Sequence, residues 1–137
     1  MAITHLVDTS VLTRFGSSSV RQALEPSVQL GVVGRAGISD LEIGFSARSA
    51  EEWDALTTAL DVMVLIPTTA EHFIRARQVQ RLLAANGLRG RKIPDLLIAA
   101  AAEERGLTVF HYDAEFDYIA QVTGQAVTWI VPRGSID

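Results

Sequence analysis

Four carboxylates lie where the sequence changes from one type of local structure to another. Asp8 directly follows a short apolar run, and Asp113 lies just after a later one. Glu42 lies early in a helical pattern, and Asp95 opens a strongly apolar helix. Carboxylate oxygens are the ligands that Mg²⁺ and Mn²⁺ prefer, and a divalent cation relieves the repulsion among clustered acids. Because such an ion can activate water and stabilise the charge on a phosphate, these acids indicate metal-assisted cleavage of a phosphate bond.

Apolar runs and helical patterns alternate along the chain and would bring these acids together. Strands are predicted over residues 3–7, 28–33, 62–66, 107–110 and 127–131. Helices are predicted over residues 11–15, from 38, over 51–60, from 68 or 69 to about 85, over 94–103 and over 114–122. This alternation predicts a single three-layer α/β/α domain over residues 1–137, with a central, mainly parallel sheet. Ligands of such sheets bind at the carboxyl ends of the strands, where we expect the acids to lie.

The amino-acid composition and the net charge limit the classes of protein to which this chain can belong. The 137 residues are 48% hydrophobic and 20% charged, which is typical of one globular domain. Twelve basic and 16 acidic residues give a net charge of −4, so nucleic acid would have to be held by a local basic patch or through metal ions. The lack of cysteine excludes disulfides and thiolate metal sites. We see no signal peptide or membrane span, and we expect a cytoplasmic protein.

Each acid also has an ordinary structural interpretation. Asp8 and Asp95 could be helix N-caps, a common use of aspartate at the start of a helix. Glu42 could be a solvated helix residue, Asp113 a turn residue and Asp117 a surface residue. However, the helix that follows Asp95 is too apolar to lie on the surface. The carboxylate of Asp95 is therefore expected near buried backbone.

Four segments that contain these acids carry a family resemblance. They are residues 6–12, 38–43, 93–102 and 109–120, with the sequences LVDTSVL, ISDLEI, IPDLLIAAAA and VFHYDAEFDYIA. In this order, and in a chain of this length, they resemble the PIN-domain ribonucleases, in particular the VapC-type toxins of bacterial toxin–antitoxin pairs. The resemblance implies a PIN-like α/β/α fold and a metal-dependent endoribonuclease that hydrolyses RNA phosphodiester bonds.

The same resemblance assigns roles to individual residues. Asp8, Glu42, Asp95 and Asp113 match the family's catalytic, metal-binding acids, which would hold Mg²⁺ or Mn²⁺. Ser10, or Thr9 beside it, matches the family's hydroxyl position near the metal, and Glu115 matches a further acid of the family. Asp117 lies one helical turn from Asp113 and could share its face as another supporting residue. Cleavage would leave a 5′-phosphate and a 3′-hydroxyl.

The family also suggests partners besides the RNA substrate. Its members commonly form homodimers and are inhibited by a cognate VapB-type antitoxin whose tail occupies the cleft. The alternative from a different functional class is a catalytically inactive PIN-fold module that acts only by binding partners. Retention of all four acids favours the enzyme.

Basic residues gather before the third acidic segment. Six of the 12 positive charges fall between residues 75 and 92, at Arg75, Arg77, Arg81, Arg89, Arg91 and Lys92. The first three could equally form a solvated helix face. Arg89, Arg91 and Lys92 lie beside the expected cleft, so we predict that they contact RNA phosphates, together with Arg14.

The histidines and tryptophans are expected to be structural. His5 and His111 lie in predicted strands, and the proposed chemistry needs no imidazole base. Trp53 shares an apolar helix face and Trp129 lies in a strand, so packing is favoured over base stacking for both. Phe45 and the 51–60 helix could belong to the core or to a dimer surface.

Overall fold

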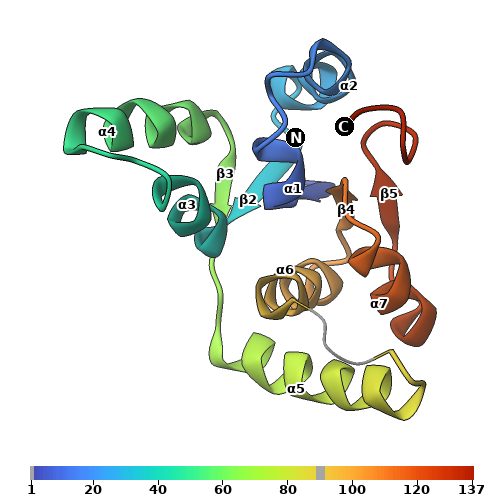
Figure 1. Cartoon of the computed structure of the whole chain (residues 1–137). Helices are drawn as coiled ribbons and strands as arrows, with labels where there is room; N and C mark the ends of the chain where they lie inside the picture. The colour runs from blue at the N-terminus through green and yellow to red at the C-terminus, as the bar shows by residue number, and fades with distance from the viewer. Residues whose placement is uncertain (1, 89–91) are drawn as a thin grey trace.

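A parallel sheet forms the centre of the molecule (Figure 1). The computed structural model describes residues 2–88 and 92–137. The strands are β1 (His5–Val7), β2 (Val33–Ala36), β3 (Val64–Ile66), β4 (Thr108–His111) and β5 (Val127–Trp129). Their spatial order is β3-β2-β1-β4-β5, and every neighbouring pair is parallel, which confirms the predicted sheet. Because the strand order changes direction between β1 and β4, a ligand crevice is expected at their carboxyl ends.

Helices cover both faces of the sheet. They are α1 (Thr9–Leu12), α2 (Ser18–Gln29), α3 (Gly37–Gly44), α4 (Ala50–Thr58), the 3-10 helix η1 (Ala59–Val62), α5 (Ala70–Ala85), α6 (Ile93–Glu104) and α7 (Glu115–Thr123). Successive strand residues face opposite sides, so Leu6 belongs to a core shared with α5, α6 and α7. Val7 belongs to a second core shared with α1, α2 and η1. These two cores make the predicted three layers.

Helix α6 is the buried helix that the apolar run predicts. Pro94 lies in its first turn, where proline breaks no helical hydrogen bond. Every residue from 95 to 102 is buried, and α6 packs between the sheet and α5 (Figure 1). Within the described part of the chain, no helix has the length and apolar character needed to cross a membrane.

The strand predicted over residues 28–33 is wrong. Helix α2 continues to Gln29, and β2 begins only at Val33. Val28 follows Val20 and Leu24 at four-residue spacing, so it contacts the core as part of a helix face. The chain then turns at Gly31, whose φ of 70° is readily adopted by glycine.

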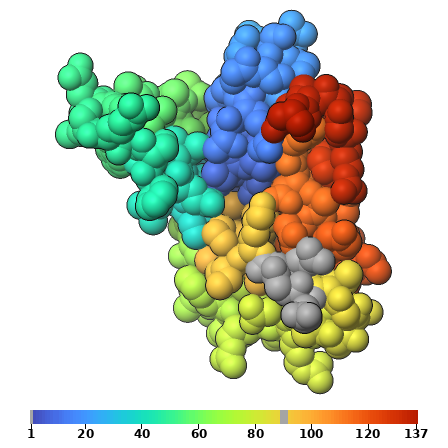
Figure 2. All heavy atoms as spheres, viewed as in Figure 1, coloured from blue at the N-terminus to red at the C-terminus, as the bar shows by residue number. Residues whose placement is uncertain are grey.

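The α3–α4 segment projects as an arm from the body (Figure 2). None of the residues of α4, all of which the structure describes, is buried. Trp53 is 44% exposed and Phe45 is 91% exposed, so the core interpretation is wrong for these two residues. It is correct for Leu60 of the same predicted helix, which is buried in the second core. The large apolar side chains on the arm are therefore available to a partner.

A buried arginine that sequence reasoning missed anchors the arm to the sheet. Arg35 of β2 donates through Nε and one Nη to the two carboxylate oxygens of Asp40 in α3, at 2.8 and 3.2 Å. Its other Nη donates to the carbonyl oxygens of Leu60 and Met63, at either end of η1. The guanidinium thus joins β2, the start of α3 and the return from the arm.

Replacing Arg35 by methionine should destabilise the fold by about 2 kcal/mol, because Asp40 and two carbonyl groups lose their donor. Urea unfolding of Arg35→Met, with Arg48→Met on the exposed α3–α4 connection as the matched control, measures this cost. An unchanged unfolding midpoint in Arg35→Met would show that the contacts contribute nothing to stability.

Candidate functional site

Asp8 serves both as a helix cap and as a buried acid. It follows β1 as the N-cap of α1, and its Oδ2 accepts a hydrogen bond from the Ser10 amide at 2.9 Å. The side chain is buried, and Oδ1 has no hydrogen-bond partner among residues 2–88 and 92–137. Burial, with smaller contributions from the charges of Glu42 and Asp113, raises the pKa of Asp8 to about 6. The capping interpretation is correct for one oxygen and leaves the other available.

Asp95 is buried without a capping role. Lys92 occupies the N-cap position of α6, and Asp95 is the third residue of that helix. Its Oδ2 has no hydrogen-bond partner within the described part of the chain. Burial first, and then the charges of Asp8 and Asp113, raise the pKa of Asp95 to about 8. A carboxyl in this environment favours either a proton or a cation.

Asp113 is held by a lysine. It lies in the loop after β4, and its Oδ2 accepts a hydrogen bond from Lys92 Nζ at 2.6 Å. Its Oδ1 accepts from the amide of Glu115 at 3.0 Å. The hydrogen bond to Asp113 raises the pKa of Lys92. Lys92, expected to contact RNA, thus also neutralises one acid of the site.

Hydroxyl groups connect Glu42 to the rest of the site. Glu42 is exposed on α3, and its Oε1 accepts a hydrogen bond from Thr9 Oγ1 at 2.7 Å. Thr9 Oγ1 also lies 2.8 Å from the hydroxyl of Ser39, a buried residue that sequence reasoning missed. The sequence signal that could have identified Ser39 is its position three residues before Glu42, which places both side chains on the same side of a helix. Ser10 Oγ accepts from the Tyr112 amide at 2.8 Å, which ties α1 to the loop after β4.

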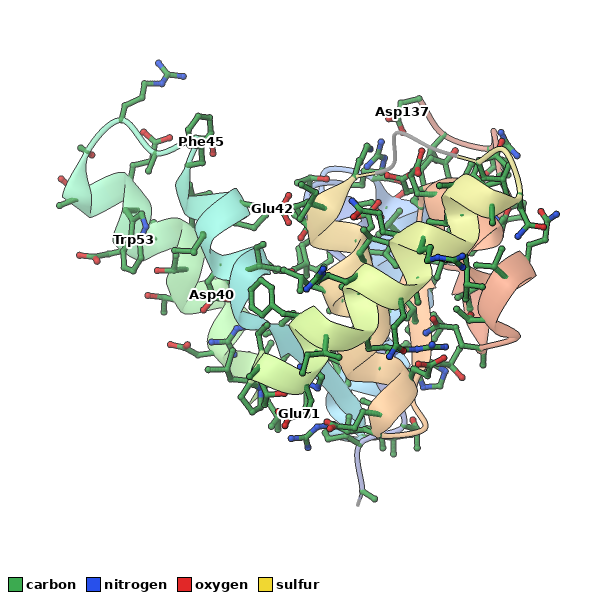
Figure 3. The ribbon with its side chains drawn as sticks, turned by 90° about the horizontal axis from the view of Figure 1, so that it is seen from below. Asp40, Glu42, Phe45, Trp53, Glu71 and Asp137 are labelled. Carbon is green, nitrogen blue, oxygen red and sulfur yellow. The ribbon has the colours of Figure 1, made fainter. Side chains whose placement is uncertain are left out.

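The four acids come from elements that meet on one face of the molecule. In Figure 2 the blue, teal, gold and orange segments that carry them adjoin one another. In Figure 3 Glu42 lies on the side of α3 that faces α6, and Phe45 lies at the outer end of the helix. The charges of Glu42 and Asp113 contribute to the raised pKa of Asp8, and the charges of Asp8 and Asp113 contribute to that of Asp95.

The acids are grouped, but they do not form a closed metal cage. Within residues 2–88 and 92–137, no three carboxylate or imidazole side chains converge as a ready ligand set. Lys92 holds Asp113, and Thr9 holds Glu42. The donor set nevertheless fits a hard divalent cation, because it offers carboxylate oxygens, two of them buried without hydrogen-bond partners in the described chain.

The remaining predicted site residues make different contacts in the structure. The charge of Glu115 contributes to the raised pKa of Asp95. The carboxylate of Asp117 accepts a hydrogen bond from Trp129 Nε1 at 3.1 Å. Arg14 donates to the Ser10 carbonyl at 2.7 Å and pairs with Asp137 at 3.2 Å. The predicted RNA contacts Arg89 and Arg91 lie outside the described residues.

His111 is a structural histidine, as expected. It is fully buried in β4, where its ring contacts those of Phe116 and Trp129. Burial lowers its pKa to about 4, so the imidazole is neutral at pH 7. Its Nδ1 accepts a hydrogen bond from the Asp113 amide at 3.2 Å and so helps to orient that acid.

Two hollows border acids of the group. A cleft of about 410 Å³ borders Asp113 and contains Arg14, Lys92, Trp129 and Arg133 in its walls. A groove of about 460 Å³ borders Glu42, and its other walls are mostly apolar. They come from the following residues: Leu12, Thr13, Phe15, Ile43, Ser46, Ala55, Leu56, Ala59 and Leu60. The group of acids is therefore bordered by a polar cleft at Asp113 and by a mostly apolar groove at Glu42.

Comparison with known proteins identifies related sequences and folds. The PIN domain family matches residues 5–122. The chain is 58% identical over 137 residues to Ribonuclease VapC51 of Mycobacterium tuberculosis (strain ATCC 25618 / H37Rv), covering 100% of both chains. It is 42% identical to Ribonuclease VapC21 of Mycobacterium tuberculosis (strain CDC 1551 / Oshkosh), over 98% of this chain and 99% of the relative.

Similar folds occur in solved structures. In the crystal structure of DNA-bound VapBC from Salmonella typhimurium, one chain superposes with a TM-score of 0.76, over 94% of this chain and 99% of that one, at 17% identity. A chain of VapBC-5 from Mycobacterium tuberculosis gives a TM-score of 0.65 at 24% identity, over 93% and 95% of the two chains. These likenesses confirm the three-layer fold.

Proposed function

This chain belongs to the PIN-domain family, and on that premise we propose that it is a metal-dependent endoribonuclease and the toxin of a toxin–antitoxin pair. The observation that carries the proposal is the pair Asp8 and Asp95, each buried with one oxygen that lacks a hydrogen-bond partner in the described chain. Burying two carboxylates costs stability, and a bound cation would offset that cost. The ribonuclease names of relatives at 58% and 42% identity support RNA as the substrate.

Asp8, Glu42, Asp95 and Asp113 would hold the Mg²⁺ or Mn²⁺ ion. When bound, such an ion supplies activation of water and stabilisation of charge on the phosphate. The protein residues position the ligands: Thr9 holds Glu42, and the Ser10 amide holds one oxygen of Asp8. The low dielectric around Asp95 strengthens its attraction for a cation.

Lys92 gives the acidic site a way to accept an anionic substrate. Its ammonium group lies 2.6 Å from Asp113 and more than half of its side chain is exposed. A phosphate that enters the cleft would compete with Asp113 for this donor, which frees the carboxylate for the metal. Lys92 would thus both neutralise the acid before binding and contact the RNA backbone afterwards.

The test of the function is metal-dependent cleavage by the purified chain. End-labelled structured RNAs are incubated with Mg²⁺ or Mn²⁺, and a parallel sample contains EDTA. We expect internal cleavage with 5′-phosphate and 3′-hydroxyl ends, abolished by EDTA. If the chain neither cleaves nor binds metal, the inactive partner-binding module is the correct description.

A VapB-type antitoxin is the proposed protein partner. The apolar groove beside Glu42 would take apolar side chains of the antitoxin, and the adjoining tail would cover the acids. The groove lies between the exposed arm and the body, where a partner segment could contact both. We also propose a cytoplasmic location, where the proposed RNA substrate is present.

A homodimer is the proposed oligomeric state. Large apolar side chains are exposed on α3, at the start of α5 and at the start of α6, namely Leu41, Phe45, Phe73, Ile74 and Ile93. Burial of such residues between two copies would remove apolar surface from water.

Phe45→Glu should convert the dimer to a monomer, because it places a charge where the most exposed phenylalanine would be buried between copies. Sedimentation velocity measures the mass. Leu30→Glu, at the end of α2, is the matched control and should remain dimeric. A Phe45→Glu protein that stays dimeric would remove Phe45 from the interface.

A further inference from the structure

The cleft beside Asp113 combines an aromatic ring with several cations. Its walls come from the end of α1, the loop after β4, and residues 129–137. Arg14, Lys92 and Arg133 contribute positive charge, and Trp129 contributes the aromatic surface. Its volume of about 410 Å³ suits a small polar ligand. Since Asp113 also lines it, a ligand in this cleft would lie next to the acidic site.

Trp129 is held rigidly at the wall of this cleft. Its indole Nε1 donates to Asp117 Oδ2 at 3.1 Å. The Tyr112 ring meets it edge-on at 5.3 Å between centroids, and the His111 ring lies at 4.9 Å. The ring is half-buried, so these contacts fix its orientation and leave part of it at the cleft. A ring fixed in this way is a preorganised stacking surface.

Arg133 adds a cation over the same ring. Its guanidinium carbon lies 5.6 Å from the Trp129 ring centroid, which is within cation–π range. Its side chain is exposed, and none of the ion pairs in the described part of the chain includes it. Arg14, by contrast, is paired with Asp137 and lies over the Tyr112 ring at 4.9 Å. Arg133 is thus the cleft arginine available to an incoming anion.

We propose that this cleft binds one unpaired RNA nucleotide next to the cleaved phosphodiester, with its base stacked on Trp129 and its phosphate contacting Arg133. Proteins that read single-stranded RNA commonly stack unpaired bases on aromatic rings and on arginine planes. The proposal rests on the proposed ribonuclease function and adds a nucleotide-binding site to it. It also gives Trp129 a role beyond the packing predicted from sequence.

The cleft would act on substrate choice rather than on bond cleavage itself. Trp129 and Arg133 do not belong to the acid group, so they contribute binding energy to a flanking nucleotide. Loss of such contacts raises KM and leaves kcat largely unchanged when substrate and transition state are bound equally. RNA that is single-stranded at the flanking position should therefore be cleaved in preference to a duplex.

Tryptophan fluorescence tests the stacking directly. The Trp53→Phe, Asp95→Asn double variant has Trp129 as its only tryptophan and lacks a proposed metal ligand. We titrate it with the single-stranded hexanucleotides rA6 and rU6 in Mg²⁺ and expect saturable quenching of the emission. The matched Trp129→Phe, Asp95→Asn protein retains only Trp53, on the distant arm, and should show no quenching.

Binding and kinetics test the arginine. Arg133→Ala should weaken rA6 binding about tenfold, as expected for loss of a cationic and stacking contact. In the otherwise native protein it should raise KM by a similar factor. Arg105→Ala, at the opposite end of α6 from Asp95, is the matched control and should change neither quantity.

The outcomes separate the two proposals. If the native chain cleaves RNA but rA6 and rU6 leave Trp129 emission unchanged, the nucleotide site is wrong and the ribonuclease stands. If both oligonucleotides quench Trp129 but the native chain cleaves no RNA, the site stands and the proposed ribonuclease function fails. If Arg133→Ala lowers kcat but not the affinity for RNA, the flanking-nucleotide role is wrong.

Discussion

Asp95→Asn should lower RNA cleavage by a factor on the order of 10²–10³ while the chain stays folded. The substitution keeps the size of the side chain and removes the carboxylate whose pKa is most strongly raised by burial and by neighbouring acids. Without this charge, the proposed cation site loses one anionic ligand at the centre of the group. The transition state of phosphodiester cleavage then loses the stabilisation that a correctly held ion provides.

Initial rates with an end-labelled RNA, measured at saturating Mg²⁺, report this loss. Asp54→Asn on the exposed helix α4 is the matched control, because it removes the same charge far from the acid group. Far-ultraviolet circular dichroism and thermal unfolding verify that both variants are folded. If folded Asp95→Asn cleaves at the native rate, Asp95 has no part in the reaction.

The metal-free protein should lose stability as the pH rises from about 4 to about 8. Asp8 and Asp95 have pKa values of about 6 and about 8 in the folded chain, against an ordinary value of 3.8. Between these values the folded chain binds protons that the unfolded chain has released, so raising the pH favours unfolding. The stability present below pH 4 is lost progressively, and because one pKa unit corresponds to about 1.4 kcal/mol the total fall should be several kcal/mol.

Divalent metal should restore that stability at high pH. A cation that binds only the folded chain at 100 times its Kd adds about 2.7 kcal/mol to the free energy of unfolding. Urea unfolding at pH 5 and pH 8, with EDTA or with Mg²⁺, measures both effects. Asp8→Asn and Asp95→Asn should each flatten the pH dependence and reduce the gain from Mg²⁺. The same metal response in both variants as in the native chain would contradict the assignment of these two acids.

The contrast between α6 and the arm shows how far local patterns predict burial. The run from residue 96 to 102 is apolar nearly all round, and such a helix can be stable only inside the protein, so its central position is correctly predicted. The helix predicted over 51–60 carries a single apolar side, which fits a core or a dimer surface equally well. Only the folded arrangement shows that Trp53 lies on an exposed arm.

The strand error and Asp8 show the same limit on a smaller scale. Val28 could extend an apolar run toward Val33 or complete a helical row with Val20 and Leu24, and contact with the core favours the helix. Asp8 after a strand predicts a cap, and the structure adds that its second oxygen is buried with no partner in the described residues. Sequence shows which residue ends an element, but not what surrounds each of its atoms.

The sequence by itself determined the α/β class, the junctions that carry the acids and the family, because periodicity and motifs are local properties of the chain. Only the tertiary structure decided which groups meet. Lys92 reaches Asp113 across 21 positions, and Ser10 reaches the Tyr112 amide across 102. The cleft of Trp129 and Arg133 beside Asp113 likewise exists only after folding. Hydrogen bonds, desolvation and charge interactions depend on distance in space, which separation along the chain does not specify.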